Sequence, residues 1–114
     1  MSEVRITIRF QCQPEHSEHW QVVCDLLGQG KFGWQLQDAI DPISVPAADA
    51  LDEVWDKLSE GIESFECGGW VDGNTVKLAL LTGGLLVEEI KNIWIPWLES
   101  CPVTELDYSL YYEY

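Results

Sequence analysis

Residues 4–12, VRITIRFQC, decide the fold, because apolar and polar side chains alternate along them without a break. An extended chain would place one set on a single face: Val4, Ile6, Ile8, Phe10 and Cys12. This period of two is typical of a strand that buries one face and leaves the other in water. We therefore expect the chain to begin with a strand of a half-covered sheet.

The end of the chain, TELDYSLYYEY (104–114), alternates in the same way and also predicts a strand. Its outward acids would face Arg5 and Arg9 if this strand paired with the first one. Opposite charges across a sheet stabilise by roughly 0.2–1 kcal/mol per pair. The two terminal strands are therefore expected to be neighbours.

Apolar residues between these strands first follow helical spacing. Pro14 suits a first helical turn, and the pattern predicts a helix over 15–27 that ends at Gly28. The alternation of Phe32, Trp34 and Leu36 predicts a short strand over 31–37. A loop containing two prolines should follow, since a proline disfavours helix at the residue before it.

The next segment predicts a helix over 47–60 with two distinct faces. Its apolar face would hold Leu51, Val54, Trp55 and Leu58. The opposite face would hold an acidic stripe, namely Asp49, Asp52, Glu53, Asp56 and Glu60. The charge of this segment is therefore concentrated on one side, and Gly61 should end the helix.

The second half predicts a hairpin followed by a helix. Residues 62–82 form two apolar runs joined at Asp72-Gly73-Asn74, and these residue types favour the positive φ angles of tight turns. Residues 85–101, LLVEEIKNIWIPWLESC, return to helical spacing. Pro96 removes one backbone donor, so this helix either kinks there or ends between 92 and 95.

Together these elements predict a single α+β domain over residues 1–114. The sheet should be mostly antiparallel, with helices packed on one face. Without the segment around 31–46, the order is the ferredoxin-like β-α-β-β-α-β, in which the first and last strands lie side by side. The expected fold is thus ferredoxin-like with an inserted strand and loop segment.

The charge balance restricts the partners. Twenty Asp and Glu against 6 Lys and Arg give a net charge of −14, which repels nucleic acid phosphates and anionic lipid headgroups and attracts basic proteins. The N-terminal segment lacks the apolar run of a secretory signal, and the four widely spaced cysteines suit buried thiols better than a disulfide framework. We expect a cytoplasmic protein that binds neither nucleic acid nor membrane directly.

Motifs for catalysis or cofactors are weak. GQGKFG (28–33) matches a dinucleotide-binding pattern, but it follows a helix and opens a strand, the reverse of the required context. His16 and His19 lie near Cys12, yet Cys12 should point into the core, so no metal site is predicted. Since no nucleophile or base is singled out either, we expect neither a cofactor nor an enzyme.

The lead hypothesis is a small inhibitor that docks its acidic helix face on a basic protein such as a nuclease-type toxin. In size, charge and aromatic content the chain is similar to bacterial toxin-immunity proteins and to acidic nucleic-acid mimics. The candidate partner-binding residues are Asp49, Asp52, Glu53, Asp56, Glu60 and Glu63, with Trp34 and Trp70 as aromatic anchors. A solvated helix face without a partner is the plain alternative. From a different class, a dimeric regulatory domain would bind a small molecule in a pocket between sheet and helices.

Overall fold

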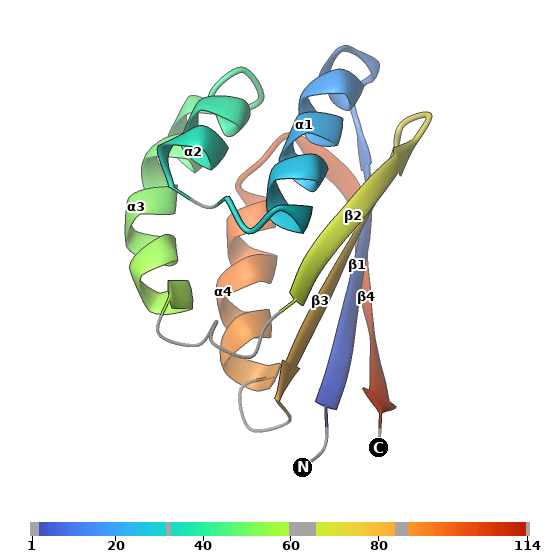
Figure 1. The fold of residues 1–114 in the computed structure, drawn as a ribbon. Coiled ribbons are helices and arrows are strands. Elements are labelled where there is room, and N and C mark those ends of the chain that lie inside the picture. The colour runs from blue at the N-terminus through green and yellow to red at the C-terminus, as the bar shows by residue number, and fades with distance from the viewer. Residues whose placement is uncertain (1–2, 32, 60–65, 84–86, 114) are drawn as a thin grey trace.

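The structure is a computed structural model that describes residues 3–31, 33–59, 66–83 and 87–113. Within these ranges, four strands form one antiparallel sheet in the order β2-β3-β1-β4 (Figure 1). The strands are β1 (Glu3–Cys12), β2 (Glu66–Asp72), β3 (Thr75–Gly83) and β4 (Val103–Glu113). Because β1 pairs directly with β4, the predicted contact between the terminal strands is confirmed.

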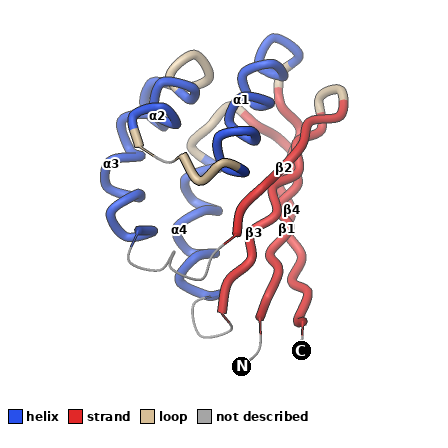
Figure 2. Tube along the Cα trace, in the orientation of Figure 1, coloured by secondary structure: helices blue, strands red, loops and turns tan. Residues whose placement is uncertain are grey.

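The described helices all lie on one side of this sheet, as Figures 1 and 2 show. They are the 3₁₀ turn η1 (Pro14–His16), α1 (Ser17–Gly28), α2 (Trp34–Ile40), α3 (Val45–Ser59) and α4 (Val87–Glu99). Helices α1 and α4 contact strands, whereas α2 packs on α1 and α3, and α3 packs on α4. The predicted α+β class is therefore confirmed, and the other face of the sheet carries no described helix.

The strand predicted over 31–37 is wrong, because the chain forms helix α2 over Trp34–Ile40. Its core contacts come from Leu36 and Ile40, which are buried four residues apart, while Trp34 is 69% exposed. Three apolar residues in alternation fit a helix start as well as a strand, so the period of this short run was ambiguous. A tertiary hydrogen bond from Gln37 Nε2 to the Ala48 carbonyl, 3.0 Å long, fixes α2 against α3.

The structure also decides two further helix boundaries. Helix α3 begins at Val45, so Pro46 lies in its first turn, where a missing N–H costs no helical hydrogen bond. Helix α4 runs through Pro96 to Glu99, which excludes the stop between 92 and 95, one of the two alternatives that Pro96 left open. The expected end of α3 at Gly61 lies outside the described residues.

The predicted hairpin is confirmed. Strands β2 and β3 pair in register, with Asp72 opposite Thr75, and Gly73 in the turn has a φ of 63°. A second glycine serves packing: a Cβ at Gly69 would lie 2.7 Å from the carbonyl oxygen of Lys77 and 3.0 Å from the sulfur of Cys24. The absence of a side chain there therefore allows α1 to approach the sheet closely.

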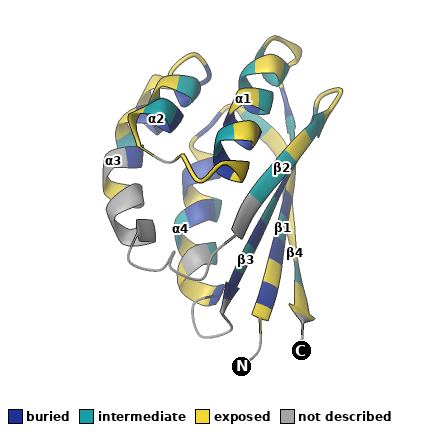
Figure 3. Cartoon of the chain, in the orientation of Figure 1, coloured by how far each residue is buried: buried dark blue, intermediate teal, exposed yellow. Residues whose placement is uncertain are grey.

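Burial in β1 alternates as its sequence predicts (Figure 3). Its inward side chains meet the apolar face of α1, and Phe10 contacts Trp20 edge to face with ring centroids 4.8 Å apart. Both rings are fully buried. The core thus fills the space between the helices and the inner face of the sheet, and every second residue of each strand points away from it.

Candidate functional site

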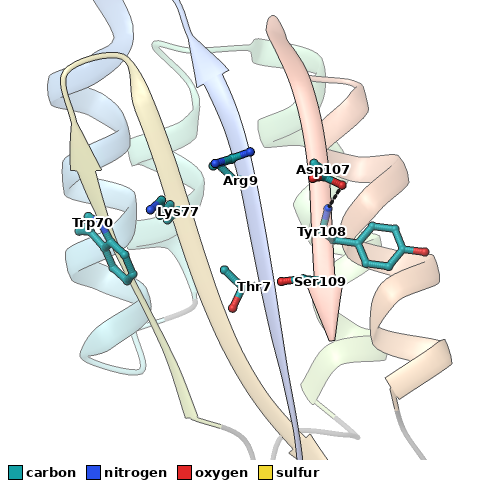
Figure 4. A pocket seen from close by; sticks show the side chains of 7 residues that line it. All are labelled: Thr7, Arg9, Trp70, Lys77, Asp107, Tyr108 and Ser109. Atoms are coloured by element: carbon teal, nitrogen blue, oxygen red, sulfur yellow. Dashed lines mark hydrogen bonds between the residues drawn. The ribbon is translucent and has the colours of Figure 1, made fainter. Parts of the chain in front are cut away.

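The outer face of the sheet gathers polar and aromatic side chains that lie far apart in the sequence. One row crosses all four strands, because Trp70 pairs with Lys77, Lys77 with Arg9, and Arg9 with Asp107. Figure 4 shows these side chains on the face opposite the helices. We call this row, together with the Thr7 and Ser109 hydroxyls beside it, the sheet-face site.

Positive charge is concentrated on the two central strands of this face. Arg5 and Arg9 from β1 and Lys77 from β3 are three of only 6 cations in the chain. The outward acids with described side chains lie instead on an edge strand or at a strand end: Glu3, Asp72 and Asp107. The outer face therefore has a cationic centre in a protein that is strongly acidic as a whole.

Lys77 and Arg9 are direct cross-strand partners, so two like charges face each other. The ammonium of Lys77 lies 5.6 Å from the centroid of the Trp70 ring, a cation–π distance. The Asp107 carboxylate accepts the backbone N–H of Tyr108 at 2.9 Å. Within the described part of the chain, the guanidinium of Arg9 has no hydrogen-bond or ion-pair partner. Its donors are therefore available to a ligand.

A shallow cavity of about 340 Å³ lies over this row. Its lining includes Thr7, Arg9, Trp70, Lys77 and Ser109. The neighbouring row contains Gly68 and Ala79, which pair with each other and add almost no bulk. Half of the Trp70 surface is exposed at one end of the hollow. Small residues in the middle and larger ones at the sides thus produce an open hollow on a surface that would otherwise be flat.

Tyr108 differs from its neighbours because its ring turns to the other side of the sheet. Figure 4 shows it pointing toward α4, and the ammonium of Lys91 on that helix lies 5.5 Å from its centroid. Lys91 is also paired with Glu88 at 2.9 Å. Lys91 therefore belongs to the helix layer and contributes nothing to the sheet-face site.

The chemistry of the sheet-face site suits binding of an anion that carries a flat ring. Arg and Lys donate charged hydrogen bonds to carboxylate or phosphate oxygens, and the hydroxyls can complete the shell. The indole of Trp70 offers a face for a planar group. No group of three His, Cys, Asp or Glu side chains in the described residues could hold a metal ion.

The predicted partner-binding residues with described side chains lie on three different elements. Asp49 and Glu53 are exposed on α3. The side chains of Asp52 and Asp56 lie outside the description, as do residues Glu60 and Glu63 entirely. Trp34 is exposed on α2 in the helix layer, whereas Trp70 lies on the outer face of the sheet. The structure therefore separates the two tryptophans and does not place Trp70 beside the acidic helix.

Sequence reasoning missed the sheet-face site although part of its signal was present. The alternation of β1 already turned Arg5 and Arg9 outward, and the two-residue turn places Lys77 opposite Trp70. The missing information was the pairing of β1 with β3, which brings Arg9 beside Lys77. The described cavities include one on the outer face of the sheet and one between α3 and α4.

The residues considered for metal binding lie on three different elements. Cys12 points into the core, while His16 and His19 lie on η1 and α1. Burial raises the pKa of both the Cys24 and Cys101 thiols to about 12, so neither is poised as a nucleophile. These thiols behave as core groups.

Comparisons of the chain with protein-family models, curated proteins and solved structures find no match. None of the described helices has the length and apolar character needed to cross a membrane.

Proposed function

We propose that this protein is a binding module whose sheet-face site recognises a small anionic ligand with a planar ring. Nucleoside monophosphates and aromatic carboxylates are ligands of this class. The observation that carries the proposal is the direct cross-strand pairing of Arg9 with Lys77. Acids outnumber cations 20 to 6, yet two cations face each other beside an exposed indole.

The energetics favour a ligand that supplies both an anion and a ring. Like charges directly opposite each other destabilise a sheet by roughly 0.2–1 kcal/mol, and a bound anion between them reverses that repulsion. Stacking a ring on Trp70 displaces the ammonium of Lys77, which costs about 0.5–1 kcal/mol at an exposed site. A base stacked on an aromatic side chain contributes about 1–3 kcal/mol. Replacing the cation–π contact by ring stacking is therefore favourable, and it frees the Lys77 ammonium to bind the anion.

Small size is part of the proposal, since a long polyanion would meet the acidic surroundings. The screening length is about 8 Å at physiological ionic strength, so a compact anion over Arg9 and Lys77 interacts mainly with those two charges. A nucleic acid strand would extend over the acids at the strand ends and around the domain. Because these acids would repel its phosphates, we propose that the protein does not bind nucleic acid directly.

For the architecture, we propose a ferredoxin-like β-α-β-β-α-β frame with α2 and α3 as the insertion. The order β1, α1, β2, β3, α4, β4 follows that frame, and β4 lies beside β1. The insertion then leaves the outer sheet face uncovered, because α2 and α3 pack on the other helices. We propose a cytoplasmic binding protein, and the proposal includes no reaction.

The test is isothermal titration of adenosine 5′-monophosphate, adenosine and inorganic phosphate into the purified protein. The nucleotide should bind more tightly than either fragment, and Arg9→Gln or Lys77→Gln should each weaken it about tenfold. The Lys31→Gln variant removes the same charge from the exposed loop after α1 and should bind as the parent does. Equal losses in the Lys77→Gln and Lys31→Gln variants would reject the site.

Docking on a basic protein, as in an inhibitor or immunity protein, is the second candidate function. It is favoured by the exposure of Asp49 and Glu53 on one side of α3, opposite the buried Ala47 and Leu51. Charge reversal of both acids to Lys should abolish association with a basic protein partner in low salt. Unchanged binding with unchanged salt dependence would show that this helix face has no role in docking.

A further inference from the structure

A second cavity, an open one of about 330 Å³, lies between helices α3 and α4 on the helix side of the molecule. We call it the helix groove. Ala50 and Glu53 line it from α3, and Ile93, Pro96 and Trp97 line it from α4. The two helices are fixed against each other because the indole N–H of Trp97 donates to the Ala47 carbonyl at 2.9 Å in a buried position. The groove is therefore formed before any ligand binds.

Pro96 gives this groove an unusual backbone acceptor. A proline inside a helix has no N–H to donate to the carbonyl four residues earlier, and here that carbonyl belongs to Asn92. Asn92 and Pro96 both line the groove. The Asn92 carbonyl thus lacks the N–H that would bond to it in a regular helix.

Two donors near the groove are already used within the protein. The Trp97 indole donates to α3, and the Ser100 hydroxyl donates to the Trp97 carbonyl. The Glu53 carboxylate remains as an exposed acceptor without an ion-pair partner in the described part of the chain. The Asn92 side-chain amide, which also lines the groove, can both donate and accept, whereas Glu53 only accepts. A cationic donor is therefore the group that Glu53 favours.

The charge around the groove has the same sign as Glu53. Exposed acids on the described turns of α3 and α4 include Asp49, Glu89 and Glu99. The one cation with a described side chain on these two helices, Lys91, is already paired with Glu88. A negative field with apolar walls suits a side chain that combines an aliphatic stem with a cationic end.

We propose that the helix groove binds an arginine side chain of a basic protein partner. The stem would lie along Ile93 and Pro96, and the guanidinium would donate to the Glu53 carboxylate and the Asn92 carbonyl. Arginine fits better than lysine because its planar fork presents several donors in different directions at once. This inference rests on the second candidate function, docking on a basic protein. It places the contact with that protein in the helix groove and not along the whole acidic stripe of α3.

The probe for the test is N-acetyl-arginine amide, and the matched neutral probe is N-acetyl-citrulline amide, which has nearly the same shape. Titration followed by ¹⁵N NMR should shift Ala50, Glu53 and Ile93 and the indole of Trp97 with the arginine probe alone. Glu53→Gln should weaken binding about fivefold or more, because a charged hydrogen bond is lost. Asp49→Asn, one turn earlier and outside the groove, should change it less than about twofold.

Pro96→Ala provides a second, independent variant. It restores the N–H that pairs the Asn92 carbonyl, so Tm should rise while the affinity for the arginine probe falls. Equal shifts with the citrulline probe, equal effects of Glu53→Gln and Asp49→Asn, or unchanged affinity in Pro96→Ala would each overturn the assignment. If the arginine probe does not bind, the assignment to the groove is rejected. Docking on a basic protein is tested independently by the charge-reversal experiment, which uses a whole protein partner.

Discussion

Replacing Asp107 by Asn should strengthen anion binding at the sheet-face site while weakening the fold. Asp107 is the direct partner of Arg9 across β1 and β4, and its carboxylate accepts the N–H of Tyr108. Asn keeps the shape and an oxygen that can accept the same hydrogen bond. The substitution therefore removes one negative charge and little else.

The expected gain in affinity follows from the strand spacing. Neighbouring strands lie about 4.8 Å apart, so an anion held midway between Arg9 and Lys77 lies roughly 7 Å from Asp107. In water two unit charges at that distance repel by about 0.6 kcal/mol, which corresponds to a factor of about 2.7 in affinity. A nucleotide phosphate carries nearly two charges, and screening offsets part of the increase, so the gain should be about threefold at low salt.

The effect on stability has the opposite sign. Without the Asp107 charge, Arg9 retains the repulsion from Lys77 and loses the attraction of an opposite charge on the neighbouring strand. The free energy of unfolding should fall by roughly 0.2–1 kcal/mol. Calorimetric titration with adenosine 5′-monophosphate and urea unfolding of the same two proteins measure both quantities.

The control is Asp41→Asn, which removes an exposed charge beyond α2 in the helix layer. It should leave the affinity unchanged. At 1 M salt, where the screening length is about 3 Å, the gain of Asp107→Asn should nearly vanish. An affinity that stays constant or falls on Asp107→Asn at low salt would refute the electrostatic reasoning.

Three other substitutions or conditions test the structure more widely. Gly69→Ala should lower the free energy of unfolding by about 1–3 kcal/mol in urea titration, because its Cβ would lie 2.7 Å from a backbone oxygen of β3. Gly68→Ala is the control, and it should not destabilise the protein because the space around its new methyl group is open. Since burial raises the pKa of the Cys24 and Cys101 thiols from 9.0 to about 12, the unfolded chain loses these protons near pH 9 while the folded chain keeps them. The free energy of unfolding should therefore fall by on the order of 1 kcal/mol per thiol between pH 7 and 10. Urea titrations at both pH values should show a smaller fall in Cys24→Ala, and an identical fall would contradict the burial of that thiol. Trp70→Ala should weaken adenosine 5′-monophosphate by roughly fivefold to a hundredfold, because the ring contact is lost. It should not weaken inorganic phosphate, because Arg9 remains and Lys77 is released from its cation–π contact.

The strands were predictable because their signal is local and strong. Alternation over nine residues in β1 and a D-G-N turn between β2 and β3 leave little freedom in register. The charge pattern of the last strand also indicated its neighbour, and Asp107 indeed pairs with Arg9. In these segments the residue pattern and the tertiary structure agree.

The segment after α1 was not predictable to the same degree. A run of three apolar residues has no unique period, and α2 depends on tertiary contacts of Leu36, Ile40 and Gln37. For α4, packing of Trp94 and Trp97 in the core outweighs the loss of one hydrogen bond at Pro96. Local propensity therefore misjudged α2 and left the course of α4 at Pro96 open, because packing decides the conformation in both places.

The candidate site depends even more on tertiary structure. Trp70 was selected as an exposed aromatic residue, and half of its surface is exposed. Its partners in the sheet-face site come from three other strands, and only the strand order places Arg9 between Lys77 and Asp107. The total charge of the chain directed attention to acids, whereas the informative feature is where the few cations lie.

The central claim is that a small anion with a flat ring binds over the outer face of the sheet. Its most direct test is a ¹⁵N NMR titration of the intact chain with adenosine 5′-monophosphate. We predict that the largest saturable shifts occur at Thr7, Arg9, Lys77 and the indole of Trp70. Shifts centred on the helix layer, or none at millimolar nucleotide, would contradict it.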